Sequence, residues 1–171
     1  MALPPQSGFS LIEILISVLV MSVGLLGLGG LQLVSVKGVN SAHSNNIASM
    51  LSMELGERMR SNPTGVEGGF YASTIDCNVK QTQCRGTQAC TPQETALFDL
   101  EELACGTIVD SKRQGGARNL LPLGILNISC VGGCDQPKAV HDLTISWGES
   151  KIHKKLTGNL QDASLTVEII P

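Results

Sequence analysis

Gly8-Phe9-Ser10-Leu11-Ile12-Glu13 opens the stretch that decides the fold. It is followed by an apolar run from Ile14 to Val36 in which no residue carries a charge. An α-helix needs roughly 20 apolar residues to cross a bilayer core, and this run is longer. A membrane span is therefore the first interpretation. Glu13 is the exception, since an ionised carboxylate within such a helix costs about 2.5–3.5 kcal/mol on the insertion scale. A charge in this place calls for a partner.

Cleavage of the chain after Gly8 would supply that partner. The new amino group on Phe9 would be a cation at neutral pH, because α-amino groups have pKa values of roughly 7.7–8.0. It would lie about one helical turn from Glu13. A carboxylate so placed neutralises its own N-terminus, or that of a neighbouring subunit whose helix is staggered by about a turn. The second arrangement would make Glu13 an assembly device.

This stretch resembles the class III signal of type IV pilins and of type II secretion pseudopilins. The resemblance implies that Gly8 precedes the bond cut by a prepilin peptidase, that Phe9 becomes the N-methylated first residue, and that Glu13 is the assembly glutamate. The continuation to Gln32 and the later segment from Glu57 to Pro63 look like those of the minor pilins in this family. The resemblance is strong over residues 8–63.

The resemblance implies an α+β fold of the type IV pilin-like kind. In this fold a long N-terminal α-helix packs on a small antiparallel β-sheet, with a disulfide-bearing variable region between them. It divides the chain into a leader that is removed, a hydrophobic transmembrane or filament-core helix, an amphipathic half of the same helix, and a periplasmic globular domain. The corresponding residues are 1–8, 9–32, 33–62 and 63–171.

The same resemblance implies a structural function. We expect a minor pilin of a type IV pilus, in the initiation or tip complex that primes pilus assembly and supports twitching motility and adhesion. The expected partners are other minor pilins, the major pilin, the prepilin peptidase/methyltransferase and a tip adhesin. The expected location is the inner membrane, as a single-pass protein with a periplasmic C-terminal domain, and then the pilus tip. The alternatives are a minor pseudopilin of a type II secretion system and a membrane-anchored periplasmic enzyme or binding protein.

Local patterns predict the remaining elements. Beyond Leu33 apolar residues recur at helical spacing, and Asn62-Pro63 ends this helix because proline disfavours helical geometry in the residue before it. On its polar face Glu54 and Arg58 have the four-residue spacing of a weak, solvated pair. A short helix is expected from Pro92 to Leu103, with loop elsewhere in residues 64–120. Alternating or β-branched segments predict three strands, at Leu123–Cys130, Asp142–Trp147 and Ser164–Ile170.

Six cysteines follow the apolar stretch, at Cys77, Cys84, Cys90, Cys105, Cys130 and Cys134. The membrane signal ahead of them predicts a periplasmic location, which is oxidising, and therefore up to three disulfides. The local pairings we expect are Cys130 with Cys134, and pairs among the other four cysteines. No two cysteines have Cys-x-x-Cys spacing and no histidine joins a cysteine cluster, so we expect no metal site.

Composition and motifs argue against other classes of function. The net charge of −3 and the aromatic content of 3% give neither a basic patch nor a stacking platform for nucleic acid. The sequence has no nucleophile elbow, phosphate loop or metal-ligand helix. We therefore expect neither catalysis nor a cofactor. The chain is instead expected to be a substrate of the enzymes that cut and methylate it at Gly8 and Phe9.

Overall fold

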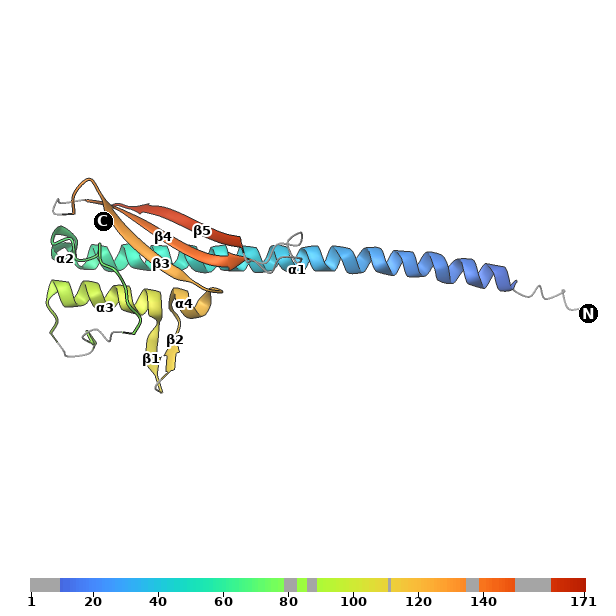
Figure 1. Ribbon diagram of the computed structural model, residues 1–171, viewed down its shortest axis with the longest axis horizontal. Helices are drawn as coiled ribbons and strands as arrows, with labels where there is room; N and C mark the ends of the chain where they lie inside the picture. The colour runs from blue at the N-terminus through green and yellow to red at the C-terminus, as the bar shows by residue number, and fades with distance from the viewer. Residues whose placement is uncertain (1–9, 79–82, 86–88, 111, 135–138, 150–160) are drawn as a thin grey trace, which may run out of the picture. The chain divides into compact units, whose positions relative to one another are not determined.

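The structure is a computed structural model that describes residues 10–78, 83–85, 89–110, 112–134, 139–149 and 161–171 (Figure 1). Gly8 and Phe9, the expected processing site, lie outside the described residues. The chain forms two compact units, one up to Ala42 and one from His43 to Pro171. The first helix, α1 (Leu11–Ser61), makes up the described part of the first unit almost entirely and continues into the second.

The ends of α1 follow from local hydrogen bonding and from proline. The carbonyl of Ser10 accepts hydrogen bonds from the backbone N–H groups of Glu13 and Ile14, at 3.0 and 3.3 Å. At the other end the helix stops at Ser61, as the sequence predicts. Asn62 then starts the next helix, α2 (Pro63–Glu67), since its side chain accepts a hydrogen bond from the N–H of Gly65 at 3.2 Å.

The predicted helix in the middle of the chain is confirmed as α3 (Pro92–Cys105). Thr91 caps it through a capping box. The N–H of Glu94 donates to the hydroxyl of Thr91 at 3.3 Å, and the Glu94 carboxylate accepts from the N–H of Thr91 at 2.9 Å. The helix buries Leu100 and Leu103, so the face that these residues define belongs to the core.

The three predicted strands are confirmed as β3 (Ile125–Val131), β4 (Val140–Glu149) and β5 (Gln161–Ile169). They form one antiparallel sheet in the order β3-β4-β5, in which Leu143 lies opposite Ile128 on one side and Val167 on the other. Alternation along β4 buries His141, Leu143, Ile145 and Trp147 on one face. Trp147 is therefore a core residue, as its place in an alternating segment suggests.

The second half of α1 supplies the other wall of the core. Its residues Ala48, Leu51, Leu55 and Met59 are buried, and they recur at the spacing of one helical face. A Cβ at Gly56 would lie 3.9 Å from a methyl group of Ile169, which shows how closely β5 approaches the helix. The core therefore lies among α1 from Ala48 onward, α3 and the inner face of the sheet.

The expectation of loop over the rest of residues 64–120 was wrong. This region also contains α2, a two-stranded antiparallel sheet and a further short helix. The elements are β1 (Thr107–Val109), β2 (Lys112–Gln114) and α4 (Gly116–Leu120). They are too short to show periodicity, and close backbone contact between glycines holds them. At Gly106, with φ 83°, a Cβ would lie 2.4 Å from the carbonyl oxygen of Gln114. At Gly116 it would lie 2.4 Å from the nitrogen of Gly106.

Two disulfides join the four cysteines that precede the main sheet. Cys77 bonds to Cys105 and Cys84 to Cys90, with Cα atoms 5.4 and 5.8 Å apart. The expected bond between Cys130 and Cys134 is not formed.

The course of the backbone after β3 explains why Cys134 does not bond to Cys130. Cys130 is paired with His141 in the β3–β4 ladder. Gly132 and Gly133 then take positive φ values of 82° and 122°. The chain turns so that the Cβ of Cys134 faces Gly69, where an added Cβ would lie only 2.9 Å away.

Candidate functional site

The described part of the first unit presents an apolar surface along α1. Every Leu, Ile, Val and Met side chain from Leu11 to Val39 is exposed, with Leu11 at 82% and Leu28 at 58%. Among the described residues α1 is the one helix long and apolar enough to cross a membrane. Apolar surface on this scale requires a cover of lipid or of other helices.

Polar side chains inside this segment are satisfied by the helix that carries them. The hydroxyl of Ser17 donates to the carbonyl of Ile14, and that of Ser22 donates to the carbonyl of Leu19, both at 2.8 Å. Neither serine therefore requires a partner outside α1.

Glu13 differs from these serines. It is the one charged residue from Leu11 to Val36, and it lies in the first turn of α1, where the helix dipole favours a negative charge. Within residues 10–78 and the other described ranges, no ion pair to its carboxylate is found. The cation expected to pair with it is the amino group of Phe9, which lies outside these ranges.

The glycines of the apolar segment leave open space beside the helix. A Cβ added to Gly24, Gly27, Gly29 or Gly30 would meet nothing within 4 Å. The helix runs through all of them without interruption. Among the described residues no contact demands glycine at these positions, and small residues of this kind let a neighbouring helix approach closely.

Within the second unit, a charged network centred on Arg58 joins the last turns of α1 to α3. Its guanidinium donates from Nη1 to Asp99 and to Glu102 of α3, each at 2.9 Å, and from Nη2 to Glu54 at 2.6 Å. The pair with Glu54 is the one that four-residue spacing predicts. The contacts across to α3 were missed, although acidic residues three apart on a helix, as Asp99 and Glu102 are, share one face. Arg58 therefore joins two helices.

Buried hydrogen bonds extend this network to the end of α1. The hydroxyl of Tyr71, which is fully buried, donates to Asp99 at 2.7 Å. The side-chain amide of Asn62 donates to the carbonyl of Pro92 at 2.8 Å. Burial raises the pKa of Tyr71 above its ordinary value, and the hydrogen bond to Asp99 raises it further. Desolvation opposes the charge on Arg58, but hydrogen bonds to Glu54 and Asp99 outweigh it and leave its pKa raised.

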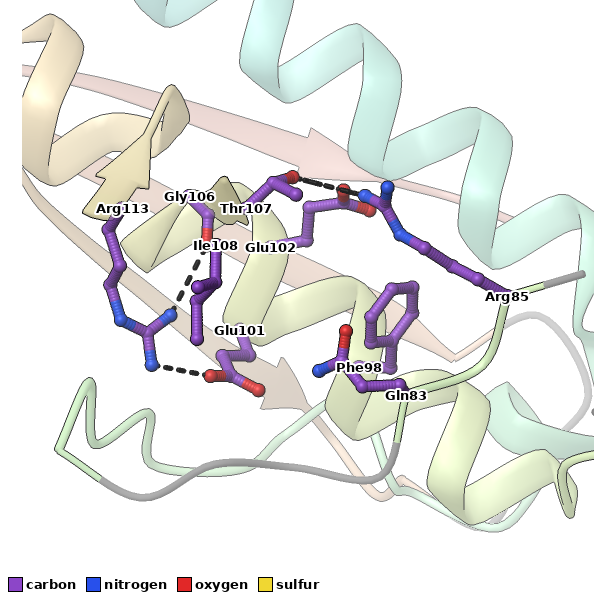
Figure 2. Close-up of a pocket in the computed structure, with 9 residues that line it drawn as sticks. All are labelled: Gln83, Arg85, Phe98, Glu101, Glu102, Gly106, Thr107, Ile108 and Arg113. Carbon is purple, nitrogen blue, oxygen red and sulfur yellow. Dashed lines mark hydrogen bonds and ion pairs between the residues drawn. The ribbon is translucent and has the colours of Figure 1, made fainter. Parts of the chain in front are cut away.

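Two further arginines fix the other end of α3 (Figure 2). Arg113 of β2 donates to Glu101 at 2.6 Å and to the carbonyl oxygens of Cys77 and Gly106 at 3.0 and 3.2 Å. Arg85 pairs with Glu102. These contacts hold β2 and the disulfide-bonded loop against α3.

The space between these two arginines is very small. Figure 2 shows Glu101 turned toward Arg113, and Arg85 reaching past Phe98 toward Thr107. The guanidinium of Arg85 lies 5.6 Å from the centre of the Phe98 ring. The cavity enclosed is about 10 Å³, which leaves room for about one water molecule. We therefore assign this cluster a structural role.

Across the described part of the chain no three His, Cys, Asp or Glu side chains come together in a way that would hold a metal ion. The acidic groups of α3 at Asp99, Glu101 and Glu102 face arginines instead. What remains as a candidate functional site is the apolar segment of α1 with Glu13 at its start.

Two family models match this helix and the segment after it. Residues 3–29 match the prokaryotic N-terminal methylation motif, and this range includes Gly8, Phe9 and Glu13. Residues 30–101 match the family described as type IV pilin Tt1218. No curated protein and no solved structure matches the chain.

The class of protein follows from the fold and these matches together. The long N-terminal helix, the small antiparallel sheets and the disulfides give the type IV pilin fold. The apolar helix and the prepilin motif fit a membrane-anchored, single-pass pilin. The motif implies processing by a prepilin peptidase and assembly with other pilins, and pilins are structural proteins. The chain is thus similar to the Tt1218-like type IV pilins and carries their N-terminal signal.

Proposed function

We propose that this protein is a minor pilin of the PilV kind, which joins other minor pilins in the initiation or tip complex of a type IV pilus. It is cleaved between Gly8 and Phe9, methylated on Phe9 and held in the inner membrane until assembly. Its C-terminal domain faces the periplasm, where the Cys77–Cys105 and Cys84–Cys90 disulfides form. In the pilus it contacts the major pilin and a tip adhesin, and so supports twitching motility and adhesion.

One observation carries this proposal. Glu13 is the one charge on a helical surface that is apolar from Leu11 to Val36 and wholly exposed. A plain membrane anchor has no use for a carboxylate there, which insertion alone would disfavour by about 2.5–3.5 kcal/mol. A filament subunit does have a use for it, because the amino group of Phe9 on a neighbouring helix would neutralise it.

The N-terminus of the mature protein tests the proposal directly. Mass spectrometry of sheared pili and of the membrane fraction should find a peptide that begins with N-methylated Phe9 in both. The same peptide in membranes alone, together with secretion components, would favour a minor pseudopilin of a type II secretion system. A retained Met1 in both fractions would overturn the assignment and favour a membrane-anchored periplasmic enzyme or binding protein.

A pair of matched variants isolates the role of the charge. Glu13→Gln keeps the size of the side chain but removes its charge, and should leave membrane insertion and cleavage intact while impairing incorporation into pili. Ser17→Ala is the control, because the hydroxyl of Ser17 is satisfied within its own helix. Immunoblots of sheared pili and membranes measure both. Equal incorporation of the Glu13→Gln protein and the parent would contradict the assembly role.

A further inference from the structure

We draw no further inference here: the strongest candidate, the groove lined by Met53 of α1 and by Ile170 just after β5, carries no proposal because nothing in the structure shows what covers it.

Discussion

Replacing Arg58 should loosen the attachment of α3 to the second half of α1. Breaking a buried ion pair costs about 3–5 kcal/mol, while an exposed pair contributes about 0.2–1 kcal/mol. The side chain of Arg58 is 24% exposed, and its partners Asp99 and Glu102 are 10% and 16% exposed. The network therefore lies between the two limits, and we expect Arg58→Met to lower the free energy of unfolding by about 2–3 kcal/mol.

The same helix provides a control. Arg60 pairs with Glu57 at 2.7 Å, but these side chains are 54% and 74% exposed. Arg60→Met should therefore cost about 0.5 kcal/mol or less. Urea unfolding of the full-length protein in micelles, followed by the fluorescence of the single, buried Trp147, measures both variants.

A double-mutant cycle with Asp99→Asn completes this experiment. Arg58 and Asp99 share a hydrogen bond of 2.9 Å, so their effects should be coupled by more than about 1 kcal/mol. If Arg58→Met costs no more than Arg60→Met, or if the coupling is near zero, the network is an ordinary surface pair and our reasoning about it fails.

Four further predictions follow from single residues. Folding raises the pKa of Tyr71, so the stability that its protonated hydroxyl contributes is complete below about pH 10 and is lost as the pH rises further. Tyr71→Phe should remove this dependence on pH, as measured by urea unfolding at alkaline pH. Thr91→Ala should lower stability by about 1 kcal/mol in thermal unfolding, since it removes a capping box. Cys77→Ser removes a disulfide between residues 28 apart in sequence, and Cys84→Ser removes one between residues 6 apart. Urea unfolding should show that the free energy of unfolding falls by about 3.5 kcal/mol for the first and by about 2 kcal/mol for the second. Gly8→Val should slow cleavage of the leader, seen as uncut protein in mass spectrometry, because the peptidase must accommodate the residue before the scissile bond.

The elements that the sequence predicts are those whose signals are local and repeated. The apolar run and the amphipathic half of α1 extend over many turns, and Asn62-Pro63 marks the end. Thr91 and Glu94 have the spacing of a capping box, and β4 alternates over its length. In each case neighbouring residues carry the whole pattern, so no knowledge of the tertiary structure is needed.

The elements that escaped prediction depend on contacts between distant residues. The short strands β1 and β2 form where Gly106 and Gly116 let two backbones approach, and a single glycine gives no periodic signal. The partners of Arg58 on α3 are more than forty residues away, at a separation of 41 for Asp99. Cys134 likewise lies four positions from Cys130, yet the turn at Gly132 and Gly133 directs it toward Gly69.

The division of α1 between two units makes its two halves separable in experiment. Glu13 lies in the unit that ends at Ala42, whereas Trp147 belongs to the core of the other unit. Effects of substitutions at distant sites without shared partners add, so Glu13→Gln should leave the urea unfolding curve of the second unit unchanged. If Glu13→Gln lowers incorporation into pili and leaves the unfolding curve unchanged, the loss can be assigned to assembly. Arg58→Met, in contrast, would lower both the incorporation and the free energy of unfolding, because it destabilises the domain. Glu13→Gln and Arg58→Met thus affect the same helix in two different ways. Measuring both incorporation and unfolding distinguishes them.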